Sequence, residues 1–504
     1  MNPQNADSSY EPRQGSRHLT HRDADWSQLR ILVAGLGVSG FAAADALSER
    51  GAIVTAVSAD ATPAISERAR ILEILEVDVR LGPEHVLEAP PRTELIVTSP
   101  GFRPDHPLML AAAARGIPVW GEVELAWRMR AQAGAAPWIT ITGTNGKTTT
   151  VKMLASILRA AGLRATSAGN VGTPLLEAVL HPEPYDVLAV ELSSFQLHWQ
   201  RSVTAVASVC LNLAPDHLDW HGSLESYRQA KAKVYAGTQI ACVYNVQDQA
   251  TQDMVREAEV AEGCRAIGFT LGIPALSMVG LVDDVLADRA FVEQRRTSAA
   301  ELASVADLQG DAPSVAPHYV ANALAAAALA RAYGVGPLSV RDGLRGFVPD
   351  PHRIADVATV GGVRFIDDSK ATNPHAAGAS LVAFDHVVWI AGGLLKGADV
   401  DGLVQSVAGR LRGVVLIGAE REQIAQALAR HAPYVPVVDV PTTDTGVMDL
   451  VVARAGELAL PGDVVLLAPA AASFDMFASY GARGDAFAQA VHRYASRPDG
   501  PAAS

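Results

Sequence analysis

Residues 138–149 read Trp-Ile-Thr-Ile-Thr-Gly-Thr-Asn-Gly-Lys-Thr-Thr, and this stretch decides the fold of the chain around it. The first five residues predict a strand and a helix follows the glycines. Glycines at this position let successive backbone N–H groups turn towards phosphate oxygens, and the helix N-terminus adds partial positive charge. Lys147 can reach the outer phosphates, and Thr148 can offer its hydroxyl to Mg²⁺. A glycine turn with a solvated lysine is the alternative, and it fits a strand–loop–helix context poorly.

The same strand–turn–helix rhythm continues on both sides, which is typical of α/β proteins with parallel sheets. A length of 504 residues is enough for about three domains. We expect a Rossmann-like N-terminal domain, a central P-loop ATPase-like domain with a parallel sheet, and a Rossmann-like C-terminal domain. A small meander or insertion is expected between residues 270 and 316. The predicted boundaries are a disordered extension at 1–28, domains at 29–131, 132–347 and 348–495, and a frayed tail at 496–504.

Composition excludes several classes of protein. Charged residues make up 19% and hydrophobic residues 49% of the chain, as in ordinary soluble globular proteins. The formal net charge of −13 argues against nucleic acid or an anionic membrane as the main partner. Three cysteines are too few for a disulfide framework and fit a reducing cytoplasm. No apolar stretch is long enough for a spanning helix, so we expect no membrane insertion.

Two acidic or histidine-containing segments follow predicted strands of the central domain. Glu191 ends the apolar run 187–190, where a carboxylate faces the ligand crevice of an open α/β sheet. Carboxylate oxygens suit Mg²⁺, and a helix-capping acid is the alternative. The segment 216–221, Asp-His-Leu-Asp-Trp-His, carries two histidines at helical spacing but lacks the glutamate of a zinc protease. A polar loop, or one histidine assisting a magnesium site, are the two interpretations.

Gly35, Gly37 and Gly40 match the spacing of the dinucleotide-binding fingerprint. The acidic residue that should hold a ribose at the end of the second strand is displaced, because Ser58 occupies that position and Asp60 lies two residues later. A loop that binds the diphosphate of another nucleotide is therefore at least as plausible as an NAD site.

Basic residues mark the strand–helix junctions of the C-terminal domain. They occur at His352-Arg353, in the segment 367–373 and in the segment 392–397. Lysines and arginines at strand ends can neutralise an anionic substrate or a phosphate in transfer. Each alone would be an ordinary surface charge, but the ends of parallel strands open on one edge, and this favours a binding site.

The loop at residues 142–149 resembles the ATP loop of the Mur ligases, which form amide bonds in peptidoglycan synthesis. Residues 191–197 and 368–373 resemble in particular the members that add D-glutamate. The resemblance covers roughly residues 30–495. It implies a cytoplasmic, monomeric ligase that uses ATP and Mg²⁺ to join D-glutamate to UDP-N-acetylmuramoyl-L-alanine through an acyl phosphate. A folylpolyglutamate synthase or another Mur-type amino-acid ligase is the alternative. A third hypothesis is a non-enzymatic ATP-binding or NAD-sensing module, which would not need the basic residues of the C-terminal domain.

The resemblance also implies roles for individual residues. Catalysis is implied for Lys147, Glu191, His217 and Lys231. Magnesium ligands would be Thr148, Glu191, His217 and Lys231, the last as a carbamate. Residues implied in ATP binding are Gly143, Thr144, Asn145, Gly146, Lys147, Thr148, Thr149, Asn322, Arg353 and Asp368. Residues implied in substrate binding are Val38, Ser39, Ser99 and Gly101 for uridine diphosphate, Asn170 and Ser193 near the reacting groups, and Lys370, Thr372, Lys396, Ser473 and Tyr480 for D-glutamate.

Overall fold

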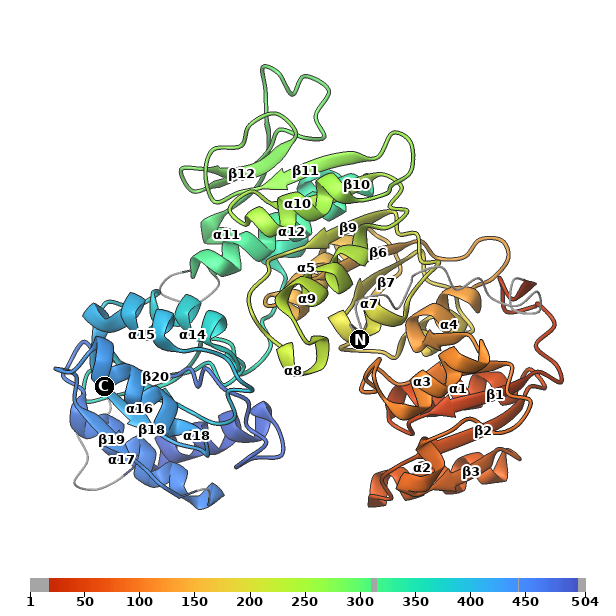
Figure 1. Ribbon diagram of the computed structural model, residues 1–504. Coiled ribbons are helices and arrows are strands. Elements are labelled where there is room, and N and C mark those ends of the chain that lie inside the picture. Colours follow the sequence, from red (N-terminus) through yellow and green to blue (C-terminus); the bar gives the residue numbers. More distant parts are fainter. Residues whose placement is uncertain (1–17, 310–314, 443, 497–504) are drawn as a thin grey trace. The chain divides into compact units, whose positions relative to one another are not determined.

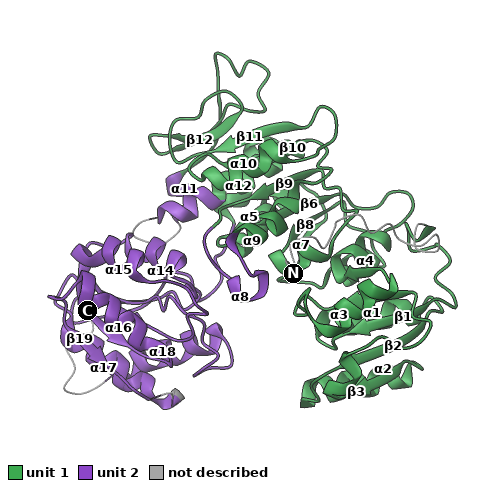
Figure 2. Ribbon diagram, viewed as in Figure 1, with its two compact units in different colours: residues 1–213, 225–304, 323–346 green, residues 214–224, 305–322, 347–504 purple. Residues whose placement is uncertain are grey.

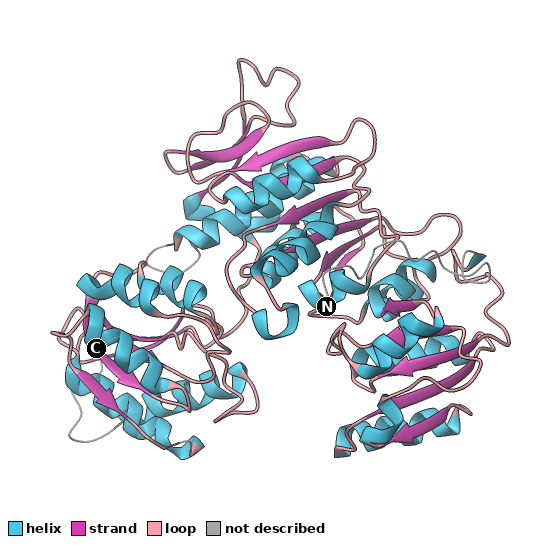
Figure 3. Ribbon diagram, in the orientation of Figure 1, coloured by secondary structure: helices cyan, strands magenta, loops and turns pink. Residues whose placement is uncertain are grey.

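The computed structural model describes residues 18–309, 315–442 and 444–496 of the chain. These residues form three separate, mainly parallel sheets of five, nine and six strands, with helices connecting most parallel strands (Figures 1 and 3). The α/β class predicted from the strand–turn–helix rhythm is therefore confirmed.

The chain divides into two compact units, which Figure 2 colours separately. Unit 1 contains the residues up to 213 together with 225–304 and 323–346. Unit 2 contains 214–224, 305–322 and the residues from 347 onwards. The first two sheets belong to unit 1 and the third belongs to unit 2. The predicted domain boundaries remain an interpretation of the sequence.

The first sheet has the strand order β3-β2-β1-β4-β5 with all pairs parallel, as in a Rossmann-like domain. Its central strand is almost entirely buried, which explains its unbroken apolar run. Its elements are β1 (Arg30–Ala34), α1 (Val38–Ser48), β2 (Ile53–Ser58), α2 (Pro63–Ile74), β3 (Asp78–Leu81), η2 (Pro83–Val86), β4 (Leu95–Thr98), α3 (Pro107–Arg115), β5 (Val119–Gly121) and α4 (Glu122–Arg128).

The second sheet has the order β14-β13-β12-β11-β10-β9-β6-β8-β7. Strands β12 to β14 form an antiparallel meander at one edge, where the sequence predicted a meander or insertion. Its elements up to β11 are β6 (Trp138–Thr142), α5 (Lys147–Ala160), β7 (Ala165–Gly169), α6 (Leu175–Leu180), β8 (Val187–Glu191), α7 (Ser194–Trp199), β9 (Ala207–Cys210), α8 (Leu218–His221), α9 (Leu224–Ala232), η3 (Lys233–Tyr235), β10 (Ala241–Asn245), α10 (Gln249–Glu257) and β11 (Arg265–Phe269). The remaining elements of this region are β12 (Met278–Val282), β13 (Val285–Asp288), β14 (Ala300–Ser304), α11 (Val305–Gln309), α12 (Pro317–Ala332) and α13 (Pro337–Arg345).

The third sheet has the order β15-β16-β20-β17-β18-β19, and only the edge strand β15 runs antiparallel to its neighbour. Apolar clusters cover both faces of this sheet, so its central strands are buried on both sides. Its elements are β15 (Ala355–Val360), β16 (Val363–Asp367), α14 (Pro374–Leu381), β17 (Val387–Ala391), α15 (Asp401–Val407), η4 (Ala408–Arg410), β18 (Leu411–Leu416), α16 (Arg421–His431), β19 (Val437–Asp439), η5 (Thr445–Val447), α17 (Met448–Leu458), β20 (Val464–Leu467) and α18 (Tyr480–Ala495).

Part of the predicted N-terminal extension is ordered. Leu19 and Trp26 are buried in the apolar core shared by the first two sheets, and the indole of Trp26 donates a hydrogen bond to the carbonyl of His21. The prediction of disorder was therefore wrong for residues 18–28, because two large apolar side chains anchor a segment whose composition is otherwise polar. Residues 1–17 and most of the predicted frayed tail, 497–504, lie outside the described residues.

Candidate active site

The phosphate loop joins β6 to α5, as the sequence predicted. Gly143 has φ 153° and Gly146, the residue before α5, has φ 83°, so both adopt conformations that residues with a side chain rarely take. Strand β6 lies between β8 and β9 in the interior of its sheet. The loop therefore sits at the carboxyl edge of the sheet, with the N-terminus of α5 directed at it.

Neighbouring residues hold the loop in shape. The ammonium of Lys147 donates to the carbonyls of Gly143 and Thr144, at 2.9 Å each. Asn212, just beyond β9, accepts from the backbone N–H of Asn145 at 2.9 Å and donates to its carbonyl at 3.2 Å. The hydroxyl of Tyr227 lies 3.2 Å from that of Thr144. The loop is thus ordered by its own chain before any phosphate binds.

Lys231 lies beneath this loop and is not on a solvated helix face. It is only 1% exposed, and its ammonium donates to the carbonyl of Gly143 at 2.8 Å. The same nitrogen lies 3.5 Å from the hydroxyl of Thr142 and 4.7 Å from the centre of the Tyr227 ring. Lysine is rarely buried in proteins, so the burial of Lys231 against the phosphate loop supports a functional role for it.

Glu191 ends β8, next to β6, as expected for a residue of the ligand crevice. It is 1% exposed, and one carboxylate oxygen accepts from the side-chain amide of Asn170 at 2.9 Å. The other oxygen is buried and has no hydrogen-bond partner within the described residues. A buried carboxylate oxygen without a hydrogen-bond partner is suited to bind a hard cation such as Mg²⁺. Thr148, which is also buried, lies at the same edge of the sheet.

The other predicted residues of the central region are placed less directly. Thr149 is buried in the first turn of α5. Ser193 caps α7 in a reciprocal arrangement with Gln196, so its observed role is structural. His217 precedes the short helix α8 with φ 53° and belongs to unit 2, whereas Glu191 belongs to unit 1. A shared metal role for these two residues remains a prediction. Within the described residues, no group of three or more His, Cys, Asp or Glu side chains is arranged so that it could hold a metal ion.

The glycine fingerprint of the first sheet is explained by close packing. A Cβ on Gly40 would lie 1.8 Å from the carbonyl oxygen of Gly35, so the helix can approach the loop only with glycine there. Ser99 Oγ donates to that same carbonyl at 3.2 Å, which places Ser99 beside the fingerprint. Val38 and Gly101 are exposed and Ser39 is half-buried.

Ser39 approaches a buried acid. Burial raises the pKa of Glu122 from 4.5 to about 7, while hydrogen bonds from the Leu176 and Leu175 N–H groups and from Ser39 oppose the rise. Glu122 therefore connects α4 and α6 to α1, the helix that follows the glycine fingerprint. No sequence pattern indicated this role of Glu122.

In unit 2, residues that are predicted to bind D-glutamate follow the carboxyl ends of three neighbouring parallel strands. Strand β20 lies between β16 and β17. Lys370 and Thr372 follow β16, Ser473 follows β20 and Lys396 follows β17. A Cβ on Gly393 would lie 2.2 Å from the carbonyl of Ala472, so the loops after β17 and β20 pack against each other. The sheet thus brings these residues to one edge, as predicted.

Side chains from distant segments also meet at this edge. The Lys370 ammonium lies 3.7 Å from the centre of the Tyr480 ring, within the range of a cation–π contact. Arg483, one turn along α18, is 1% exposed and donates to the hydroxyl and the carbonyl of Ser369 at 2.9 Å each. It also donates to the carbonyl of Ala471 at 3.2 Å. Arg483 therefore joins the loops after β16 and β20.

Three of the residues implied in ATP binding, Asn322, Arg353 and Asp368, lie in unit 2. Burial raises the pKa of Asp368 to about 7, and hydrogen bonds from Ser380 and from the N–H of Ile354, together with the charge of Arg353, oppose the rise. Burial, aided by Arg353, lowers the pKa of nearby His318 to about 4. Asn322 is buried on α12.

Besides Glu122, sequence reasoning missed three residues that shape the site. Asn212 and Tyr227 hold the phosphate loop, and Arg483 holds the loops of unit 2. Asn212 had a usable signal, because it follows a buried strand at the same sheet edge as the loop. Tyr227 and Arg483 lie within amphipathic helices, where nothing local distinguishes a buried polar contact from a solvated face.

Three family models match the chain in succession. They are the Mur ligase MurD-like N-terminal domain at residues 29–121, the Mur ligase middle domain at 141–330, and the Mur ligase glutamate ligase domain at 352–471. A UDP-N-acetylmuramoylalanine–D-glutamate ligase from Streptomyces avermitilis is 61% identical over 467 residues, which are 93% of this chain and 98% of the relative. The chain belongs to the Mur ligase family.

Other relatives of this Mur ligase carry the same name. One from Streptomyces coelicolor is 59% identical over 93% of the chain and 98% of the relative, and one from Mycolicibacterium smegmatis is 46% identical over 92% and 96%. The resemblance inferred from the motifs is confirmed.

Solved structures show the same fold at low identity. A pseudomurein peptide ligase type C from Methanothermus fervidus matches with a TM-score of 0.56 at 15% identity, over 92% of this chain and 100% of that one. MurF from Acinetobacter baumannii matches with a TM-score of 0.55 at 19% identity, over 94% and 92%. These structural similarities support only the fold, with its three sheets.

Proposed function

We propose that this Mur ligase joins the amino group of D-glutamate to the carboxyl group of UDP-N-acetylmuramoyl-L-alanine, with cleavage of ATP to ADP and phosphate. The observation that carries the proposal is the 61% identity, over nearly the whole length of both chains, with a relative named for this reaction. The preformed phosphate loop and the basic strand edge of unit 2 supply the chemistry that the reaction needs.

A carboxylate is a poor acyl donor at neutral pH, so it must first be activated. Transfer of the γ-phosphoryl group of ATP to the alanyl carboxylate gives an acyl phosphate, which has a good leaving group. The D-glutamate amine then attacks the carbonyl carbon and phosphate departs. The phosphoryl step mainly requires positioning and positive charge. In this chain the N–H groups of the loop at 143–146, the α5 N-terminus and Lys147 supply both.

Mg²⁺ would be held by Glu191 and Thr148 together with phosphate oxygens, and would neutralise charge on the phosphoryl group in transfer. The orphaned buried oxygen of Glu191 supports this assignment. Asn170 orients the carboxylate through its other oxygen. We further propose His217 as a magnesium ligand.

Lys231 is proposed to carry a carbamate in the working enzyme. A neutral lysine amine adds CO₂ and becomes an anionic oxygen ligand, which suits Mg²⁺. Burial favours the uncharged amine that this addition requires. The nearly complete burial of Lys231 against the phosphate loop supports the proposal.

D-Glutamate is proposed to bind at the strand edge of unit 2. Lys370 and Lys396 would neutralise its carboxylates, and Thr372, Ser473 and Tyr480 would orient it. The uridine diphosphate of the other substrate would bind at the glycine fingerprint and Ser99. The displaced ribose acid supports uridine diphosphate over NAD at this place.

We also propose that the enzyme acts in the cytoplasm as a monomer. Its three cysteines are free thiols, as in reducing compartments. Among the residues that the structure describes, there is no helix with the length and hydrophobicity that crossing a membrane requires.

Phosphate release measured with each substrate in turn tests the function. ATP should be cleaved only when both UDP-N-acetylmuramoyl-L-alanine and D-glutamate are present. Parallel reactions contain L-glutamate, meso-diaminopimelate, or L-glutamate with a folate acceptor. Equal turnover with any of these would overturn the assignment.

A further inference from the structure

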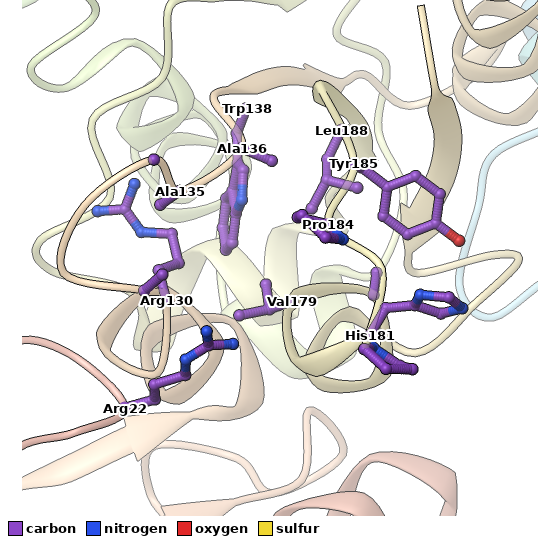
Figure 4. Close-up of a pocket in the computed structure, with 14 residues that line it drawn as sticks. Arg22, Arg130, Ala135, Ala136, Trp138, Val179, His181, Pro184, Tyr185 and Leu188 are labelled. Carbon is purple, nitrogen blue, oxygen red and sulfur yellow. The ribbon is translucent and has the colours of Figure 1, made fainter.

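A small pocket lies away from the phosphate loop, in the connection between the first two sheets of unit 1. Its lining combines the linker that follows α4, the start of β6, the end of α6 and the segment leading into β8. The residues that matter for its chemistry are Arg22, Arg130, Trp138, His181 and Tyr185 (Figure 4). In this view the two arginines lie on one side, His181 and Tyr185 on the other, and Trp138 between them.

The pocket is cationic although the whole chain is acidic. Its lining contains two arginines and one histidine but no carboxylate. The neighbouring acid, Glu183, is already paired with Arg164 at 2.8 Å, and the carbonyl of Glu183 lies 2.8 Å from His181 Nδ1. A lining with cations and no carboxylate favours an anionic ligand.

Arg130 is a half-buried cation without an acidic partner among the described residues. Its Nε donates to the carbonyl of Trp127 at 2.9 Å, and its guanidinium stacks on the Trp127 ring. Burial lowers the pKa of Arg130 to about 10, so it still carries its charge at neutral pH. Arg22, whose backbone N–H donates to the Arg130 carbonyl, likewise forms no ion pair in the described part of the chain. Partial removal of a cation from water without a counter-ion costs free energy, and a bound anion relieves part of that cost.

Trp138 offers the pocket an unused donor. Its side chain is 1% exposed, and its Nε1 is buried without a hydrogen-bond partner within the described residues. Buried indole N–H groups normally find an acceptor. Two arginine side chains and Trp138 therefore belong to the lining of a space whose other walls come from His181, Tyr185 and apolar residues such as Val179 and Leu188.

We propose that this pocket binds a small oxyanion, either a phosphate or a short carboxylate. The cavity has a volume of about 80 Å³. At ~10–15 Å³ for each water-sized occupant, it has room for roughly five to eight non-hydrogen atoms. Inorganic phosphate and four-carbon dicarboxylates such as succinate fall in this range, whereas a nucleotide is far too large. The phosphate loop and the D-glutamate edge are built from other residues.

Binding is measured on the full-length protein without nucleotide, by tryptophan fluorescence and thermal melting during titration with sodium phosphate or sodium succinate. Sodium chloride keeps the ionic strength constant. We expect a saturable response to at least one of the two anions, and which of them binds distinguishes a phosphate site from a carboxylate site. Absence of a saturable response to both would overturn the proposal.

Variants separate this pocket from the phosphate loop. Arg130→Met should weaken binding at least ~10-fold, as expected for loss of a charge-assisted contact. Trp138→Phe, which keeps an aromatic ring but removes the donor, should weaken it less. Arg159→Met removes an exposed arginine from the end of α5 and should bind as the unmodified protein does. Lys147→Ala should remove any response that comes from phosphate at the phosphate loop, and should leave in place the response that depends on Arg130. Unchanged binding in both Arg130→Met and Trp138→Phe, or its loss in Lys147→Ala, would refute the assignment.

Discussion

Replacing Arg483 by methionine tests whether a buried cation organises the D-glutamate edge. The change removes the donors that Arg483 directs at Ser369 and Ala471. Two buried carbonyls lose this donor, at ~1–3 kcal/mol each. The Ser369 hydroxyl keeps a bond, because it also donates to the carbonyl of Tyr480 at 2.7 Å. The gross loss of stability is therefore about 2–6 kcal/mol.

An opposing contribution limits that loss. Burial lowers the pKa of Arg483 from 12.5 to about 10, which corresponds to a desolvation cost of about 3 kcal/mol that methionine does not carry. The net destabilisation should thus stay below about 3 kcal/mol, and the variant should fold. The loop that carries Lys370 and the loop that carries Ser473 would then lose their common anchor.

Steady-state kinetics for each substrate show the consequence. A misplacement of ~1 Å costs up to ~10²-fold, so we expect kcat/KM for D-glutamate to fall ~10–10²-fold in Arg483→Met. The KM for UDP-N-acetylmuramoyl-L-alanine, assigned to unit 1, should change less than ~2-fold. Arg483→Lys should be intermediate, because one ammonium cannot span the acceptors that a guanidinium reaches.

The matched control is Arg454→Met on α17, which removes an exposed arginine paired with Glu457 at 2.8 Å. Surface ion pairs of this kind contribute little to stability, so kcat and the KM for each substrate should remain unchanged. Equal changes in the KM of every substrate for Arg483→Met, or unaltered D-glutamate kinetics in a folded variant, would refute the reasoning.

Four further predictions concern other parts of the molecule. Lys147→Ala and Glu191→Ala should each lower turnover ~10²–10³-fold with unchanged circular dichroism, and near-normal turnover at saturating ATP and Mg²⁺ would contradict their roles. Lys231→Ala should be nearly inactive and partly rescued by acetate but not by chloride at equal ionic strength; full activity would remove the carbamate from the mechanism. Gly40→Val should weaken binding of the UDP-muramoyl substrate at least ~10-fold in calorimetry, because its Cβ would lie 1.8 Å from a loop carbonyl, and NAD should bind to neither protein. Glu122 has a pKa raised from 4.5 to about 7, so the native state holds a proton that the unfolded chain releases, and stability falls as pH rises through that window. Glu122→Gln should remove about 3 kcal/mol of this decline in the free energy of unfolding between pH 5 and pH 8, and parallel profiles for the two proteins would exclude the effect.

Local patterns predicted the elements whose chemistry is contained in a short segment. Gly143 and Gly146 adopt φ values that favour glycine, and the residue patterns on either side of them are those of a strand and a helix. The phosphate loop could therefore be predicted from the sequence. The same holds for Glu191, which ends a buried strand. The N-terminal segment was misjudged because its polar composition concealed Leu19 and Trp26, and burial of these two side chains depends on partners far along the chain.

The sequence by itself determined the α/β class, the phosphate loop and the set of basic strand ends, because each depends on residues close together in the chain. Only the tertiary structure decided which of those ends are neighbours. Strand β20 inserts between β16 and β17, and this places the loop of Ser473 between those of Lys370 and Lys396, although Ser473 follows them by about 100 and 80 residues in the chain. It likewise decided that Lys231 is buried and that Arg483 holds two loops together. Burial and hydrogen bonding between distant segments arise from packing, and no local pattern of residues contains them.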